Sequence, residues 1–188
     1  MTALPDWMVR SGEGLTVADY EALPEEVCRR IEIVDGAVVV SPSPRRAHQH
    51  IAHNLVTALK EIAPPGYTAV GDVDLRLRDV PLLNRRPDVV VYDAALPDDE
   101  PLRPEHCLLV VEIMSEGSVT TDQIDKPGEY AASGIRHFWR VEYDDHVISV
   151  FRYQLDPTTR TYGLAGLDKR KLVISDPVEL ELDLETLR

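Results

Sequence analysis

The sequences RPDVVVYD at residues 86–93 and LLVVEIMS at residues 108–115 decide the fold. Each contains a short run of valine, leucine or isoleucine, as found in strands that are buried on both faces in the middle of a sheet. Each also carries a carboxylate beside or inside the run, Asp88 in the first and Glu112 in the second. A buried carboxylate is costly to desolvate unless it is paired or binds a metal ion. The two runs therefore predict successive strands with a site between them.

The next segment, TTDQIDKPGEYAASGIRHFW at residues 120–139, adds a lysine, Lys126. Neighbouring strands lie about 4.8 Å apart, so Asp88 and Glu112 can share one divalent ion. Magnesium prefers one or two carboxylates with waters and a phosphate oxygen, and a lysine beside the ion can activate the attacking water. The three residues thus suggest a phosphodiesterase site. A turn aspartate, a solvated glutamate and a surface lysine explain the spacing equally well.

Composition indicates a single soluble globular domain over residues 1–188, with a loose arm at residues 1–14. Of its 188 residues, 44% are hydrophobic and 28% charged, which is ordinary for such a domain. The net charge of −13 comes from 33 acidic and 20 basic residues. This charge opposes nonspecific attraction to nucleic acid but leaves room for a local basic groove.

The location is predicted to be cytoplasmic. The N-terminal sequence has no apolar signal region, and no run approaches the length of a membrane span. Cys28 and Cys107 have no metal-ligand spacing and lie in apolar surroundings. They predict buried free thiols in a reducing compartment.

Local signals predict several further elements. Thr16 with Asp19 resembles a capping box at the start of a short helix. The dipeptide Asp35-Gly36 between two β-branched runs predicts a type I′ hairpin over residues 31–40. Apolar residues at helical spacing predict an amphipathic helix over residues 45–62.

The remaining chain is expected to be mostly strands. Alternation within residues 67–78 predicts a half-exposed strand, and residues 85–87 are expected to turn into the strand that follows Asp88. Pro127 predicts a break near Lys126, with the proline in the first turn of a helix. Later strands are expected at residues 137–142, 147–153 and 178–182.

The order of these sequence segments resembles the order found in a known family. RPDVVVYD is followed by VVEIMS, by the spacing D(x3)K(x3)Y over residues 122–130, by Gly134-Ile135 and by FWRVE. Upstream lie LTVADYEALP, IEIVDG, and SPSP followed by His48. The combination, across roughly residues 15–153, resembles the Uma family. Its bacterial members are described as restriction-endonuclease-like proteins of the PD-(D/E)xK nuclease superfamily.

The resemblance implies an α/β fold: a restriction-endonuclease-like mixed β-sheet flanked by helices, with an N-terminal hairpin and additional C-terminal strands. It implies a metal-dependent endonuclease in which Asp88 and Glu112 hold Mg²⁺ or Mn²⁺. The superfamily lysine lies two residues after the second acid, where this chain has Met114. In this family the role appears on the following helix, at Lys126. Glu32 matches the additional acid that often completes such sites.

Other residues are candidates for contact with the substrate. Gln123, one turn before Lys126, could face the scissile phosphate or water, and His48 matches a family position. On a helix His48 and His50 point to different sides, so we do not expect a transition-metal cluster there. A phosphate-facing patch and a set of solvated arginines are equal alternatives for Arg45, Arg46, Arg76, Arg78, Arg85 and Arg86.

The expected partner is nucleic acid, with DNA as the first choice, although the sequence does not decide between DNA and RNA. Nucleases of this architecture commonly act on duplexes as homodimers. Two alternatives stay open. The acidity, and Pro127 directly after Lys126, favour an inactive nuclease-fold protein that serves as a binding or regulatory module. A nuclease for short or single-stranded nucleic acid would need only weak electrostatic attraction.

Overall fold

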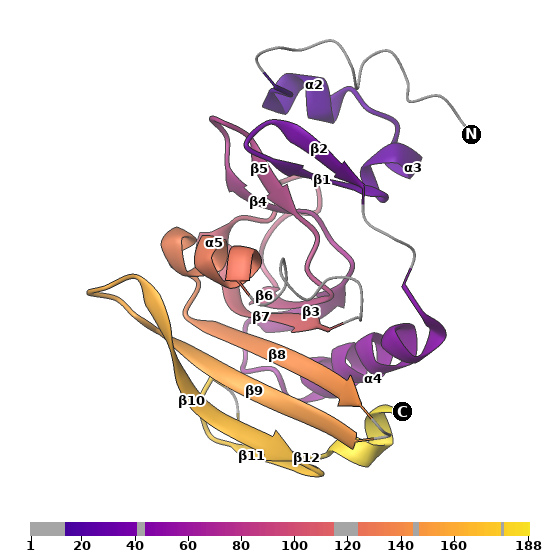
Figure 1. The fold of residues 1–188 in the computed structure, drawn as a ribbon, viewed down its shortest axis with the longest axis vertical. Helices are drawn as coiled ribbons and strands as arrows, with labels where there is room; N and C mark the ends of the chain where they lie inside the picture. Colours follow the sequence, from indigo (N-terminus) through magenta and orange to yellow (C-terminus); the bar gives the residue numbers. More distant parts are fainter. Residues whose placement is uncertain (1–13, 41–43, 115–123, 145–146, 178) are drawn as a thin grey trace.

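The computed structural model describes residues 14–40, 44–114, 124–144, 147–177 and 179–188. Their strands form a four-stranded sheet, a six-stranded sheet and a two-stranded sheet. The four-stranded sheet lies above the six-stranded one, and the two-stranded sheet lies at the opposite end near the C-terminus (Figure 1). The arrangement is the mixed α/β fold, with an N-terminal hairpin and additional C-terminal strands, that the sequence predicts.

The N-terminal sheet has the strand order β2-β1-β5-β4. Its hairpin turns at Asp35 and Gly36, with φ angles of 51° and 81°. Both angles lie in the left-handed region that a type I′ turn requires, so the predicted hairpin is confirmed. The strands are β1 (Ile31–Val34), β2 (Ala37–Val40), β4 (Leu75–Arg78) and β5 (Leu83–Arg85).

Two short helices precede this sheet, α2 (Val17–Glu21) and α3 (Glu25–Cys28). Thr16 caps α2 through its side chain, and the Asp19 side chain accepts from the Thr16 backbone, which confirms the capping box. Tyr20 packs with the buried face of β1.

The six-stranded sheet has the order β10-β9-β8-β7-β6-β3. Strands β7 and β8 are parallel, whereas the other neighbours are antiparallel. A parallel pair needs a crossover connection, and α5 (Lys126–Ser133) lies in it and ends at Gly134, whose φ is 89°. The strands are β3 (Tyr67–Gly71), β6 (Val89–Asp93), β7 (Cys107–Ile113), β8 (His137–Asp144), β9 (Val147–Asp156) and β10 (Thr161–Lys169).

Alternate residues of β6 and β7 face two different cores. On one face Val89 and Val111 pack with α4 (Arg46–Ile62), and on the other Val90 and Val110 pack with Tyr130 of α5. The predicted amphipathic helix is thus confirmed, and both valine runs form buried central strands.

The C-terminal part completes the core beside α4. It consists of β11 (Lys171–Ile174), β12 (Leu180–Asp183) and the 3-10 helix η3 (Leu184–Leu187), and another 3-10 helix, η1 (Pro104–His106), precedes β7. The strand predicted at residues 178–182 corresponds to β12, although Val178 itself lies outside the described residues. No local sequence pattern predicted β10 or β11.

Three local predictions are corrected. Residues 67–78 form two strands instead of one continuous half-exposed strand, because the chain breaks at Asp72, whose φ is 53°. Arg76 is buried instead of solvent-facing. Arg85, expected in a turn, lies in β5 with its side chain buried.

Both cysteines are thiols in this structure. Cys28 and Cys107 are free and partly buried, and burial raises the pKa of the Cys107 thiol to about 12. Within the described residues, no helix is both long and apolar enough to cross a membrane.

Candidate active site

Asp88 stands at the start of β6, between Pro87 and Val89. Its Oδ2 accepts a hydrogen bond from the Ile113 backbone N–H at 2.7 Å and lies 3.2 Å from His48 Nε2. The side chain is 21% exposed. Within the described residues, all hydrogen bonds of the Asp88 carboxylate fall on Oδ2, so Oδ1 is available for a ligand.

Strand register brings the two predicted metal ligands to one place. Val89 pairs with Val111 in the antiparallel β6–β7 ladder, and continuing that register by one residue places Asp88 opposite Glu112. On the other side of β6, Gly71 of β3 leaves room for the Asp88 backbone. A Cβ atom at Gly71 would lie 3.0 Å from the Asp88 carbonyl oxygen, so a larger residue would displace Asp88.

Glu112 is 2% exposed and is held by α5. Its Oε2 accepts from Lys126 Nζ at 3.0 Å, and its Oε1 accepts from the Tyr130 hydroxyl at 2.6 Å. Lys126 and Tyr130 are four residues apart and therefore share a helix face. Pro127 occupies the first turn of α5, as predicted, so the lysine keeps a helical setting.

Glu32 of β1 is the third acid of the cluster, at 4% exposure. Its Oε1 lies 3.4 Å from Lys126 Nζ and accepts from the Arg86 backbone N–H, while its Oε2 accepts from Arg85 at 3.0 Å. Burial alone would raise the pKa of Glu32. Lys126, the Arg86 N–H and Arg85 outweigh burial and hold this pKa below its usual value, so Glu32 is ionised.

Arg85 ties the N-terminal sheet to α5. Its Nε and Nη2 donate to the two oxygens of Glu129 at 2.7 Å each, while Nη1 bonds Glu32. Burial opposes the charge of Arg85, but the two carboxylates outweigh it and raise the pKa of the guanidinium. No local sequence signal marks this residue, because its role depends on pairing between distant strands.

The hydroxyl of Tyr130 is kept neutral. Burial and the nearby carboxylates of Glu112 and Glu32 raise its pKa well above the usual value for a tyrosine. Tyr130 therefore acts as a hydrogen-bond donor that orients Glu112.

Most of the six candidate arginines contact carboxylates of this chain. Arg85 is occupied as described, and Arg86 contacts Asp72 and Asp74. Arg76 pairs with Glu21, and Arg78 with Asp35. Four of the six thus form internal ion pairs, which neither alternative anticipated, and substrate contact by Arg86 stays a prediction. Arg45 and Arg46 are exposed at the start of α4.

Two further residues, His48 and Gln123, were predicted to contact the substrate. His48, in the first turn of α4, reaches Asp88 and so lines the site. Gln123 lies outside the described residues. His50 and His53 are exposed, and across the described ranges no group of three or more His, Cys, Asp or Glu is placed to hold a metal ion.

A two-carboxylate magnesium site nevertheless suits this donor set. Mg²⁺ needs only one or two protein carboxylates when waters and a phosphate supply the other ligands. Asp88 offers Oδ1, and each ionised carboxylate oxygen of Glu112 has a second lone pair beyond its hydrogen bond. Asp88 contacts α4 through His48, and Glu112 contacts α5 through Lys126.

Arg140 is a neighbour of the site that sequence reasoning did not single out. It is the register partner of Glu112 in the parallel β7–β8 ladder. Its guanidinium lies 4.4 Å from the ring centroid of Phe151 and 3.0 Å from Glu142 Oε1. The parallel pairing that creates this proximity is not visible in the local sequence.

Comparisons with known proteins concern the fold and the family of the chain. The chain is similar to a solved structure described as a putative nuclease belonging to DUF820 from Anabaena variabilis, with 17% sequence identity and a TM-score of 0.66. The alignment covers 92% of this chain and 97% of the other. At this identity the likeness concerns the fold alone. A search of curated proteins finds no match.

A family model described as "Putative restriction endonuclease" matches residues 17–185. That range contains Glu32, Asp88, Glu112 and Lys126, and it spans nearly all the described elements. The chain therefore belongs to the Uma2 family.

Proposed function

We propose that the protein is a metal-dependent endonuclease that hydrolyses phosphodiester bonds of nucleic acid, DNA in the first instance. The observation that carries the proposal is the position of Lys126 Nζ between Glu112 Oε2 at 3.0 Å and Glu32 Oε1 at 3.4 Å, beside the strand corner where Asp88 lies. Family membership supports the same class of activity.

Asp88 and Glu112 would hold Mg²⁺ or Mn²⁺. The ion, when bound, would polarise the phosphate and lower the pKa of a bound water. Lys126 orients the attacking water and donates to phosphate oxygens as negative charge develops on them. Tyr130 fixes the Glu112 carboxylate, and Arg85 fixes Glu32, which assists by holding Lys126.

The alternative is an inactive nuclease-fold protein that works as a binding or regulatory module. One observation favours it: Lys126 already forms ion pairs with both Glu32 and Glu112, so the cluster is electrostatically satisfied without a ligand. A module of this kind would bind nucleic acid or protein without cleaving it.

Calorimetric titration with Mn²⁺ separates the two functions. Asp88→Asn and Glu112→Gln keep side-chain volume and remove a ligand charge, so each should abolish or weaken binding by tenfold or more. Glu61→Gln is the matched control, because Glu61 is an exposed acid at the far end of α4. Equal Mn²⁺ affinity in all four proteins would contradict the metal site. Since phosphate can complete the coordination, the titration is repeated with a thymidine monophosphate ester present.

Cleavage assays then test the chemistry. Plasmid, linear and single-stranded DNA are incubated with Mg²⁺, Mn²⁺ or EDTA. Cleavage should require the divalent ion and should fall at least a hundredfold in Lys126→Met. Cleavage that survives both EDTA and Lys126→Met would come from a contaminant or another site. Binding without cleavage, in the presence of bound Mn²⁺, would favour the regulatory module.

Homodimerisation is a further proposal, since two-strand cleavage needs two sites. Strand β2 ends the N-terminal sheet and could pair with a second copy, whereas the outer edge of β4 is bridged to Leu102. Light scattering at micromolar concentration, with and without DNA, measures the assembly. A monomer under both conditions would contradict the dimer. We also propose that residues 1–188 form a single domain and that the protein acts in the cytoplasm.

A further inference from the structure

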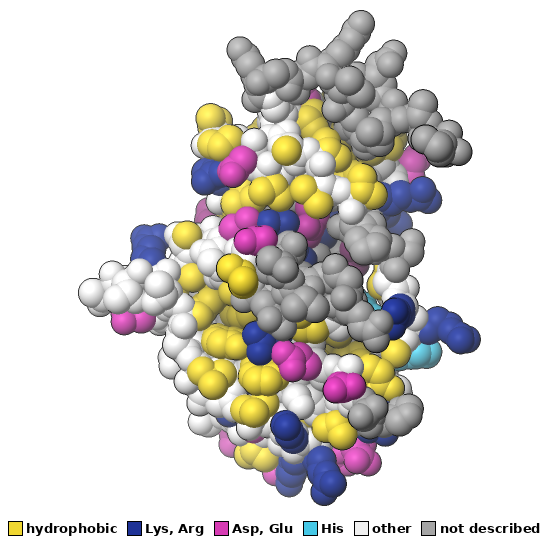
Figure 2. Space-filling model, in the orientation of Figure 1, with side chains coloured by type: hydrophobic (Ala, Val, Ile, Leu, Met, Phe, Trp, Pro, Cys, Tyr) yellow, Lys and Arg dark blue, Asp and Glu magenta, His cyan; other side chains and the backbone are white. Residues whose placement is uncertain are grey.

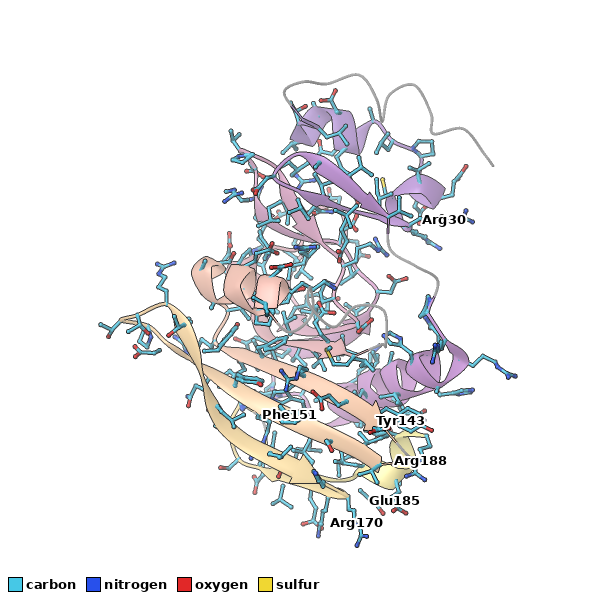
Figure 3. The ribbon with its side chains drawn as sticks, viewed as in Figure 1. Arg30, Tyr143, Phe151, Arg170, Glu185 and Arg188 are labelled. Carbon is cyan, nitrogen blue, oxygen red and sulfur yellow. The ribbon has the colours of Figure 1, made fainter. Side chains whose placement is uncertain are left out.

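A cavity of about 780 Å³ opens at the start of α4. Its wall includes Arg45, Arg46 and His50 from the first turns of α4, Tyr143 from the end of β8, and Arg188 after η3. We call this group the α4 pocket. Tyr143 and Arg188 lie close together beneath α4 in Figure 3.

The α4 pocket is basic in an acidic chain. No aspartate or glutamate side chain of the described residues lines it, although the whole chain carries a net charge of −13. Within the same residues, Arg46, His50 and Arg188 make no ion pair. Lys, Arg and His side chains gather over the start of α4 on the right of Figure 2. The pocket therefore suits an anionic ligand.

The helix itself indicates the same ligand charge. A helix N-terminus favours acidic residues because of its dipole, yet the first turn of α4 has none. Arg45 at the N-cap gives no side-chain hydrogen bond to the first turn. Cations here destabilise the free helix, whereas a bound phosphate would accept from the helix N–H groups and pair with the arginines.

Two elements connect the α4 pocket to the site. On α4, His48 contacts Asp88, and its neighbours Ala47 and Ile51 line the pocket. On β8, Val141 is the register partner of Ile113, and Tyr143 follows two residues later. Two strand residues span about 7 Å, so Tyr143 lies a short distance along β8 from the strand pair beside Asp88.

Tyr143 gives the pocket an aromatic surface. The side chain is 36% exposed at the pocket wall. Basic side chains beside an exposed aromatic ring are the combination with which proteins bind single strands, because every base has a face that can stack. A paired base in a duplex does not offer that face. The cavity volume falls within the range of sites for small ligands, so it can accept one nucleotide.

We propose that the α4 pocket binds one unpaired nucleotide of a single nucleic-acid strand that flanks the bond at Asp88. Arg45, Arg46 and His50 contact its phosphate, and Tyr143 stacks on its base. The proposal rests on the proposed endonuclease function and narrows its substrate to single-stranded or locally unpaired nucleic acid.

The test is fluorescence anisotropy with a short labelled oligothymidylate, in EDTA so that no cleavage occurs. Arg46→Ala should weaken binding and reduce the salt slope by about 0.7, the value for one phosphate contact on a single strand. Tyr143→Ala should weaken binding roughly 5- to 150-fold, as expected for one stacked base. Tyr143→Phe and Arg30→Ala should bind like the wild type. Arg30 is exposed and lies far from the pocket (Figure 3).

Three results would overturn the proposal. They are no binding by the wild type, equal binding by all variants, and equally tight binding of a blunt duplex of the same length. Thermal unfolding of each variant confirms that it is folded. The Mn²⁺ titration separates the two proposals. If the protein binds no Mn²⁺ while strand binding depends on Arg46 and Tyr143, the proposed endonuclease is contradicted and the proposed nucleotide pocket is supported. If Mn²⁺ binds while those variants bind like the wild type, only the pocket fails.

Discussion

Two charged regions lie at the same end of the six-stranded sheet, and they differ in whether acidic and basic side chains pair within the region. The buried charge cluster consists of Glu32, Arg85, Glu112, Lys126 and Glu129, and its groups pair with one another at 2.7–3.4 Å. The α4 pocket, by contrast, gathers exposed cations with no acidic side chain among its described lining residues.

The charges of the buried charge cluster hold its geometry, whereas the α4 pocket presents exposed basic side chains on the surface. In the buried charge cluster, every ion pair costs desolvation and is compensated by its partner, so the cluster specifies one arrangement. In the α4 pocket the cations oppose the dipole of their own helix, which lowers stability. Substitutions should therefore affect stability in the first region and ligand affinity in the second.

The largest effect is expected for Arg85→Met, which keeps volume and removes charge. Glu32 is left buried without one of its two ion-pair partners, so the free energy of unfolding should fall by about 3–5 kcal/mol. Urea unfolding measures the change. The double variant with Glu32→Gln should recover part of it. A loss below about 1 kcal/mol would mean that the buried charge cluster does not act as a unit.

Tyr130→Phe should have the next largest effect. It removes one hydrogen bond to a buried carboxyl group that pairs with Lys126 and keeps the ring, so a loss of about 1.5–3 kcal/mol is expected. Tyr67→Phe, at an exposed tyrosine, is the control and should change stability little. Equal stability of the two variants would show that Glu112 finds another donor.

The pKa of Glu32 predicts a pH-dependent difference. This pKa lies below its usual value of 4.5 when folded, so the unfolded chain binds the proton more readily. Stability from Glu32 is complete above about pH 4.5 and is lost as the pH falls through the folded pKa. The stability gap between wild type and Glu32→Gln should therefore shrink in acid. A gap that stays constant from pH 7 to the acid transition would contradict the ion pairs.

The smallest stability change is expected in the α4 pocket, and with the opposite sign. Arg46→Glu replaces an unfavourable charge at a helix N-terminus with a favourable one and should stabilise by about 0.3–1 kcal/mol. The same variant should bind oligothymidylate more weakly than the wild type. Thermal unfolding and anisotropy measure the two effects on one sample. Destabilisation together with unchanged binding would remove the contrast between the two regions.

Elements with local signals were predictable from the sequence. The Thr16 capping box, the Asp35-Gly36 hairpin and the long helix α4 each depend on residues close together in the chain. The valine runs identified the central strands, and the resemblance supplied the family. The proximity of Glu32, Glu112 and Lys126 followed from that resemblance, and their catalytic roles stay predictions.

Features that depend on distant pairing were not predictable. Arg85 lies near Glu32 because β1 pairs with β5, and Arg140 lies near Glu112 because β7 pairs with β8. Strand β10 has a largely exposed pattern with glycines and no apolar alternation. Arg76 was expected in solvent because its neighbours alternate, yet it pairs with Glu21 across 55 residues of sequence.

The parallel β7–β8 pair has a consequence for the order of folding. Lys126 lies in the crossover between these strands, Glu32 comes from the first sheet, and Glu112 from the second. Contacts between such distant segments form slowly because long loops must close first. During synthesis, therefore, only the Glu32–Arg85 pair of the buried charge cluster can form within the N-terminal sheet. Glu112 and Lys126 join it after β7 and α5 have emerged.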